Sequence, residues 1–350
     1  TDLHTHSYHS DGYQTPTALV YEAYRRGLKA IALTEHCTLK GVKEAVEAGK
    51  IFGVEVIPGV EMMTSDYENR GTEILIYWPD QDRFFSWYNS RPGRAARERF
   101  EEIRRAREET LREAIRKINQ NYPEIAINEE DVIRFAGDRP LTIGSVCAAI
   151  LDKYGDKISE IIGELVRNTR DVYNAMLKKF ISYRKDILLS PEQAIEFAVK
   201  NGGVAVLSHP KQFLDKGGSV EELRDYIRRL TESGLVGLQV SDWRNEETDT
   251  QLFKELAEQF GLVPVVGSDY HGPKMSWAGT MAMGAVNENY PRGNLDIELG
   301  SYRQIANLRA LEPFTIVEIT TANLATVGGV QSYLEGLNRE LLTRRRLRIH

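Results

Sequence analysis

The sequence predicts an α/β protein: a distorted (β/α)7 barrel with a helical insertion domain. Short β-branched, apolar runs alternate with helix-period segments over the first 80 residues and again from about residue 190. This alternation is typical of strands joined by crossover helices. Between the two regions almost no strand signal occurs. Seven strands can be counted, which favours a closed or nearly closed barrel over an open sheet.

The first half of the barrel is expected to hold four strands. Thr15 or Thr17 can cap the first helix, and Pro16 suits its first turn. The expected elements are a truncated strand before His4, a helix from Thr15 to about Gly27, a strand over 28–33, a helix over 41–52, and strands over 54–57 and 73–77.

The second half begins after the insertion. Within the insertion we expect helices over 94–121, 143–151, 158–166 and 172–181. The barrel then continues with a helix over 191–200, a strand over 204–207, a helix over 220–233, a strand over 236–240, a helix over 247–260 and a strand over 262–267. Near the C-terminus we expect helices over 302–311 and 330–342, and a possible strand over 315–320.

This pattern divides the chain into three regions. Residues 1–80 plus 190–290 form the barrel, residues 81–189 form a cap domain, and residues 291–350 form an extension packed on the barrel. The oligomeric state cannot be read from the sequence.

The bulk properties narrow the range of partners and locations. The net charge of -6 argues against binding long nucleic acid by bulk electrostatics, because neutralising phosphates requires a surplus of Lys and Arg. No apolar run approaches the roughly 18 residues needed to span a bilayer, so membrane insertion is not expected. Only two cysteines are present, too few for a disulfide framework, and we expect a cytoplasmic protein.

Histidines cluster at the start of the chain. His4, His6 and His9 are three of the seven histidines in the sequence. Residues two apart in a strand point to the same side, so His4 and His6 can face one metal ion. The same spacing recurs at Asp269 and His271, directly after another strand.

Three further strands end in residue types that bind metals: Glu35-His36, Glu61 and His209 each follow an apolar run. A single such residue is more often a core or capping group than a ligand. Five strand ends together favour a metal site, because the C-terminal ends of parallel barrel strands form one rim. Imidazole with carboxylate suits Zn, Mn or Fe, and two cysteines are too few for a thiolate-rich site.

These motifs resemble those of the PHP (polymerase and histidinol phosphatase) superfamily. The resemblance rests on Asp2-Leu3-His4-Thr5-His6-Ser7, Ser10-Asp11-Gly12, Thr34-Glu35-His36, Pro58-Gly59-Val60-Glu61, Ser208-His209-Pro210 and Gly267-Ser268-Asp269-Tyr270-His271. It covers about 1–80 and 190–275. It implies a distorted seven-stranded barrel whose two or three divalent metal ions serve the hydrolysis of phosphoesters.

The resemblance also implies how the ligands are shared. One ion would be held by His4, His6, Glu61 and Asp269, a second by Asp11, His36 and His271, and a third by Glu61 and His209 with Glu73. The family usually has a histidine where this sequence has Glu73, so Glu73 either binds an ion or leaves the third site vacant. Glu35 is expected to orient a neighbour. His9 is expected to be an exposed loop residue or a substrate contact.

The leading functional hypothesis is a metal-dependent phosphoesterase. It would hydrolyse a small phosphomonoester, such as a nucleotide, a sugar phosphate or a histidinol-phosphate-like compound, by attack of a metal-bound water. Asp11, His209 or a metal-bound water are candidates for delivering a proton to the leaving group. A phosphodiesterase or exonuclease acting on a cyclic nucleotide or short nucleic acid is the alternative. A metal-binding scaffold without turnover and a hydrolase of carbon–nitrogen bonds are less favoured.

Substrate phosphate should also meet cationic side chains. Arg91 and Arg94 are candidates because the insertion helix is expected to leave the rim just after the strand that begins at Glu73. Lys211 lies two residues past His209, and Arg244 follows Trp243 after another strand. The competing interpretation is that the arginines of the insertion helix simply form a solvent-exposed face, since they alternate with glutamates.

Overall fold

Seven strands form one sheet in the order of the sequence, β1-β2-β3-β4-β5-β6-β7. The computed structural model describes residues 1–137, 139–272 and 283. The strands are β1 (Asp2–Thr5), β2 (Ala30–Leu33), β3 (Glu55–Met62), β4 (Ile74–Tyr77), β5 (Val204–Leu207), β6 (Gly237–Ser241) and β7 (Val263–Val266). The backbone of Tyr270, just past β7, bonds to His4 in β1 and to His6 directly after it. The sheet therefore curves into a nearly closed barrel, as the sequence predicts.

Strand β4 departs from the expected parallel arrangement. It pairs antiparallel with β3 on one side and with β5 on the other, whereas the other neighbouring strands pair parallel. An antiparallel strand starts at the end of the barrel where its parallel neighbours finish. Glu73, immediately before β4, therefore lies at the same rim as the residues that follow the parallel strands.

Side chains alternate between the inside and the outside of the barrel. In β2, Ala30 and Ala32 belong to the interior cluster, while Ile31 and Leu33 pack toward the helices. This two-residue period explains why small and β-branched residues dominate the strands. The outer face is covered by apolar residues of the surrounding helices, among them Leu19, Val46, Ile195, Leu230 and Leu256.

The helices follow local sequence signals. Thr15 caps the first helix by accepting a hydrogen bond from the backbone N–H of Ala18, with Pro16 in its first turn. The helices are α1 (Pro16–Arg25), α2 (Val42–Phe52), α3 (Tyr67–Arg70), α4 (Gln81–Asn89), α5 (Arg91–Asn121), α6 (Glu129–Ala136), α7 (Ile143–Tyr154), α8 (Lys157–Ile162), α9 (Thr169–Val172), α10 (Pro191–Lys200), α11 (Lys211–Asp215), α12 (Val220–Glu232) and α13 (Glu247–Phe260).

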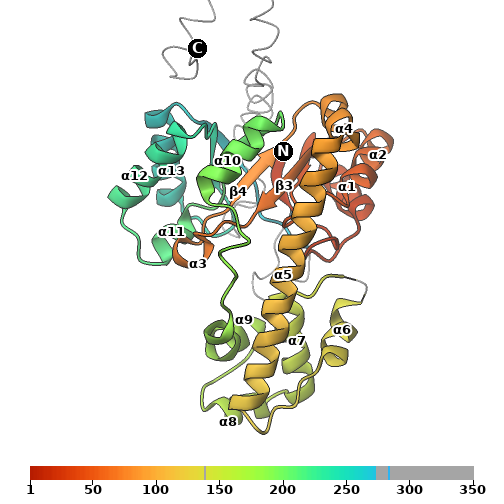
Figure 1. The fold of residues 1–350 in the computed structure, drawn as a ribbon, viewed down its shortest axis with the longest axis vertical. Helices are drawn as coiled ribbons and strands as arrows, with labels where there is room; N and C mark the ends of the chain where they lie inside the picture. Colours follow the sequence, from red (N-terminus) through yellow and green to blue (C-terminus); the bar gives the residue numbers. More distant parts are fainter. Residues whose placement is uncertain (138, 273–282, 284–350) are drawn as a thin grey trace, which may run out of the picture.

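A second group of helices lies beyond one end of the barrel. Helix α5 extends from the barrel to α6–α9, as Figure 1 shows. Phe100 and Ile103 of α5 pack in the barrel cluster, whereas Ala114 and Ile118 belong to a separate apolar cluster with the later helices. One helix thus contributes to two hydrophobic cores.

Several elements differ from the expected ones. Helices α3, α4, α6 and α11 were not expected, and the stretch after α9 continues as a π-helical turn (Tyr173–Leu177) and a 3-10 turn (Lys178–Phe180). The N-terminus of α6 carries a capping box in which Asn128 and Asp131 bond to each other's backbone N–H. The elements expected over 302–311, 315–320 and 330–342 lie outside the described residues. Among the described helices, none is long and apolar enough to cross a membrane.

Candidate metal centre

The rim of the barrel gathers nine histidine and carboxylate side chains from positions 4 to 271. Among the described residues, three groups have ligand atoms within 4.8 Å of one another: His4, His6, Glu61 and Asp269; His6, Asp11, His36 and His271; and His36, Glu61 and Glu73. The eight residues in these groups were all expected from the sequence to meet. The ninth, His209, contacts the third group.

The first group surrounds one point. The Nε2 atoms of His4 and His6 lie 3.1 and 3.3 Å from the Oε2 atom of Glu61, and both lie 3.3 Å from the Oδ1 atom of Asp269. Two ligand atoms each at ~2.1 Å from one ion in a tetrahedral arrangement would lie roughly 3.4 Å apart. The spacing therefore fits a single divalent ion.

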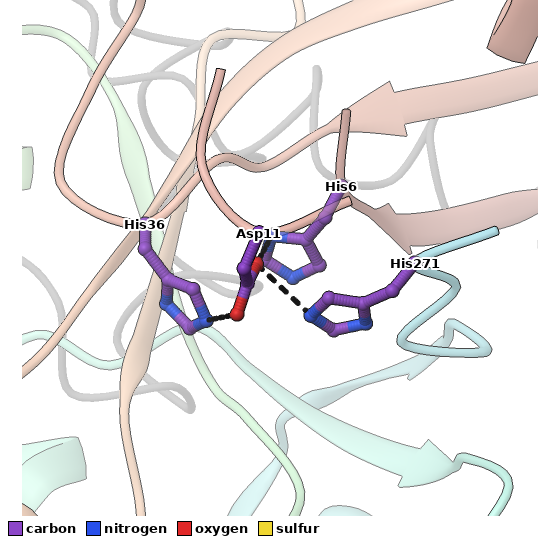
Figure 2. Close-up of side chains that lie close together, drawn as sticks. All are labelled: His6, Asp11, His36 and His271. Atoms are coloured by element: carbon purple, nitrogen blue, oxygen red, sulfur yellow. Dashed lines mark ion pairs between the residues drawn. The ribbon is translucent and has the colours of Figure 1, made fainter. Parts of the chain in front are cut away.

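The second group is centred on Asp11. Figure 2 shows its carboxylate between the rings of His36 and His271, with His6 close by. The Oδ1 atom of Asp11 is 3.1 Å from His271 Nε2, and its Oδ2 atom is 3.5 Å from His36 Nε2. His6 is more distant, with its Nδ1 atom 3.9 Å from Oδ1.

The third group lies where β2, β3 and β4 meet the rim, next to His209 after β5. Glu61 faces His209 with its Oε1 atom, 2.9 Å from Nε2, while its Oε2 atom faces the first group. Glu73 is buried and lies 3.6 Å from His209 Nε2 and 3.5 Å from His36 Nδ1. Glu73 thus lies beside the candidate ligands His36 and His209, and Glu61 can bridge the first and the third group.

Several ligand atoms in these groups lack a hydrogen-bond partner. They are buried, which would normally be costly for a polar atom. The atoms are His4 Nε2, His6 Nε2, His36 Nδ1, Glu61 Oε2 and Glu73 Oε1. Since all five face neighbouring ligand atoms at the rim, bound cations would satisfy them. The residues present therefore fit a metal centre.

Two buried residues orient the histidines. Gln239 on β6 accepts from His4 Nδ1 at 3.1 Å and from the backbone N–H of His209 at 2.9 Å, and its amide donates to the carbonyl of Gly267 at 2.8 Å. The bond from His4 Nδ1 leaves the Nε2 lone pair of that ring facing the ion position. Sequence reasoning missed Gln239, although a glutamine inside an apolar strand was a usable signal.

Glu35 acts on the loop between His6 and Asp11. It accepts hydrogen bonds from Ser7 and from the hydroxyl of Ser10. The Ser10 hydroxyl in turn lies 3.4 Å from His6 Nδ1. This arrangement matches the expectation that Glu35 positions its neighbours.

The electrostatics of the rim couple the rings to the carboxylates. Burial lowers the pKa of His4, but the charges of Glu61 and Asp269 outweigh it and raise that pKa to about 9. The pKa of His271 likewise rises to about 9, because Asp11 and Asp269 outweigh its burial. Without bound cations, protonated His4 and His271 therefore supply positive charge next to these carboxylates at neutral pH.

The backbone is unusual at the rim. Among the described residues, positive φ occurs outside glycine at His209 (27°), Asp269 (56°) and Cys37 (48°). The first two are candidate ligands and Cys37 follows His36. Such conformations carry strain that often marks functional sites. Strands β1 and β6 also show register irregularities, next to His4 and at Gln239, which can re-aim side chains.

A cavity of about 630 Å³ opens above the metal centre toward the second group of helices. Its barrel wall includes His9, Asp11, Glu73, His209, Trp243 and Arg244. Its other wall includes Arg104, Arg107, Arg139, Arg170, Tyr173 and Lys178. Cations and aromatic rings therefore face the site from the helices.

Of the four expected substrate cations, Arg244 lines this cavity. Its Nη2 atom donates to Asp269 at 2.7 Å, and it stacks over Trp243. Lys211 does not line the cavity and pairs instead with Asp249 at 2.9 Å.

Arg91 and Arg94 are exposed and are not among the cavity residues. The reason for expecting them there was wrong. Because β4 is antiparallel, the chain leaves it at the end opposite the rim, and α5 must run back along the barrel. At ~1.5 Å per residue, the rim is reached only later in the helix, near Arg104 and Arg107.

The chain matches the PHP domain family over residues 2–234, more than half of its length, and belongs to that family. It is 28% identical to a 5'-3' exoribonuclease of Haemophilus influenzae over 277 residues, covering 78% of this chain and 90% of the relative. It is 27% identical to a 3',5'-nucleoside bisphosphate phosphatase of Chromobacterium violaceum over 276 residues, covering 78% and 87%. As a member of this family, the chain is a metal-dependent phosphoesterase, a hydrolase of phosphoric ester bonds.

The solved structures agree on the fold. A Bifidobacterium adolescentis protein assigned as a metal-dependent phosphoesterase superposes with a TM-score of 0.64 at 21% identity, covering 88% of this chain and 95% of that one. The expected PHP-type barrel is confirmed.

Proposed function

We propose that this enzyme hydrolyses a small phosphoester of nucleotide size at the rim of the barrel. The observation that carries the proposal is the cavity, which joins the ligand groups to a wall of cations and aromatic rings. Its volume of about 630 Å³ falls in the range of roughly 300–1,000 Å³ that small-molecule sites occupy. Tyr13, Tyr173 and Trp243 provide flat surfaces for a base or sugar ring.

The proposed ligand sets follow the geometry. One ion would be held by His4, His6, Glu61 and Asp269, a second by Asp11, His36 and His271, and a third by Glu61, Glu73 and His209. Nitrogen and carboxylate donors suit Mn, Fe or Zn. When bound, such ions would activate water and offset the charge of phosphoryl oxygens.

The remaining roles belong to the protein's own side chains. Gln239 fixes the ring of His4, and Arg244 holds Asp269 in place through its 2.7 Å bond. Asp11 and His209 both line the cavity, so either can reach a leaving group. We propose residues 81–189 as the cap that encloses the substrate, and a cytoplasmic location for the enzyme.

A second candidate function is exonuclease activity on short RNA. It is favoured by the likeness to the exoribonuclease over most of that protein's length. The exposed cations Arg170 and Lys178 on the cavity wall could follow a phosphate backbone. Both functions would use the same ligand groups.

A substrate panel tests the proposal. The purified protein is loaded with Mn²⁺, Fe²⁺ or Zn²⁺ and assayed with p-nitrophenyl phosphate, a nucleoside 5'-monophosphate, a nucleoside 3',5'-bisphosphate and a 5'-phosphorylated RNA tetramer. We expect turnover of the monomeric esters, abolished by His4→Ala. Preference for the tetramer would favour the second candidate. No turnover of any ester with metal bound would refute both.

A further inference from the structure

Arg107, in the middle of α5, is a half-buried arginine that faces the metal centre from the opposite wall of the cavity. It lies between the part of α5 that packs on the barrel, ending near Ile103, and the part that packs with the later helices, from Ala114. The helix is anchored at both ends of this segment, so the position of Arg107 over the rim is fixed by two hydrophobic cores.

Arg107 differs from its neighbours on the helix in its pairing. Six other arginines of α5 bond to or pair with a carboxylate or a carbonyl: Arg97, Arg99, Arg104, Arg105, Arg112 and Arg116. The guanidinium of Arg107 has no hydrogen bond or ion pair with any residue that the structure describes.

The sequence explains this difference. On a helix, charged partners lie three or four residues away. For Arg107 these positions hold Ile103, Arg104, Thr110 and Leu111, none of which is acidic. Burial lowers the pKa of Arg107, and Tyr183, Cys37, Glu73 and Asp11 together raise it above its ordinary value.

Those two carboxylates are already placed among the ligand groups. Arg107 lines the cavity, and its guanidinium carries five N–H donors without an acceptor among the residues that the structure describes. A guanidinium that lines a cavity without a protein acceptor can bind a ligand that supplies one. A phosphate offers paired oxygens that match the guanidinium fork. Arg244 contrasts with it, because its Nη2 atom already donates to Asp269.

We propose that Arg107 is a phosphate-binding residue, contributed by α5 to the substrate bound at the metal centre. This inference rests on the proposed function, because it concerns the same site. It assigns to α5 a direct part in substrate binding, beyond enclosing the cavity. The ligand class is a phosphate ester or free phosphate.

The test compares Arg107→Gln and Arg107→Lys with a matched control, Arg105→Gln. Arg105 lies on the same helix, its side chain is 74% exposed, and it does not line the cavity. In the Mn²⁺-loaded proteins, the Kd for inorganic phosphate is measured by calorimetry, and kcat and KM are measured with p-nitrophenyl phosphate. Metal content and melting temperature are measured for every variant.

We expect Arg107→Gln to weaken phosphate binding and lower kcat/KM by roughly 10- to 100-fold, the effect of losing charge-assisted hydrogen bonds. Lysine should recover part of the binding, since it keeps the charge but not the fork. The control should match the wild type.

Phosphate affinity in Arg107→Gln equal to that of the control would overturn the proposal. Loss of bound metal or a lower melting temperature in both Arg107 variants would also overturn it, by showing a structural role. A wild type that binds phosphate through Arg107 but hydrolyses no ester would refute the proposed function and leave the phosphate site standing.

Discussion

Gln239→Leu should weaken metal binding more than any other change to a residue that is not itself a candidate ligand. The substitution removes the acceptor of His4 Nδ1 and of the backbone N–H of His209, and the donor to Gly267. Leucine is close in volume to glutamine, so the loss of these bonds should dominate over cavity formation.

The magnitude follows from three bonds in a fully buried position. Each buried polar group left without a partner costs about 1–3 kcal/mol. Partial relaxation of the loop that carries His209 should reduce the sum, giving a destabilisation of about 2–5 kcal/mol. Losing a partner that orients a ligand typically weakens metal affinity by roughly 10- to 100-fold.

The assay combines urea unfolding of the metal-free protein with a Mn²⁺ titration. Gln251→Leu is the matched control, because Gln251 is exposed on α13 and bonds only to Glu255 among the described residues. We expect the control to change neither quantity. Normal stability and normal Mn²⁺ affinity in Gln239→Leu would refute the reasoning that this amide sets the tautomer of His4.

Three further outcomes are expected. Glu73→Ala should remove one bound ion and leave the others, as measured by elemental analysis, and an unchanged metal count would show that Glu73 binds none. The pKa of His4 and of His271 is raised to about 9, so their protonated forms stabilise the metal-free fold fully below pH ~6.5, and this stabilisation is lost as the pH rises through 9. Mn²⁺ binding at pH 7.5 should therefore release protons from these rings, which calorimetry in two buffers would detect. If no protons were released, the raised pKa values would be contradicted. Ile150→Ala, in the apolar cluster of the second helical group, should destabilise the protein by about 2–5 kcal/mol, whereas the exposed Ile133→Ala should be neutral; equal melting temperatures of the two variants would contradict that packing.

The sequence was most informative where one local pattern determines one outcome. Alternating β-branched runs predicted the seven strands, and strand-end residues such as His36 and Glu61 predicted which side chains meet at the rim. Both predictions rest on short-range periodicity and on the rule that parallel strands end on one side of a barrel.

The direction of β4 could not be predicted in this way. A four-residue apolar strand has the same pattern whether it runs parallel or antiparallel, and its direction depends on pairing with distant β5. The antiparallel direction of β4 also affects the functional site. It places the start of α5 away from the rim, so that Arg91 and Arg94 lie outside the cavity.

The roles of two single polar residues depend on contacts between distant parts of the chain. Gln239 and Arg107 matter because of partners that they have or lack across the fold, and neither lies in a recognisable motif. Their identification required the three-dimensional positions of residues far apart in the chain.

The most direct test of the metal centre is the location of bound ions. Crystals of the protein grown with Mn²⁺ should give anomalous difference peaks at the rim. We expect one peak among His4, His6, Glu61 and Asp269, and a second beside Asp11, His36 and His271. Anomalous peaks elsewhere, or none at the rim with Mn²⁺ present in excess, would contradict this assignment.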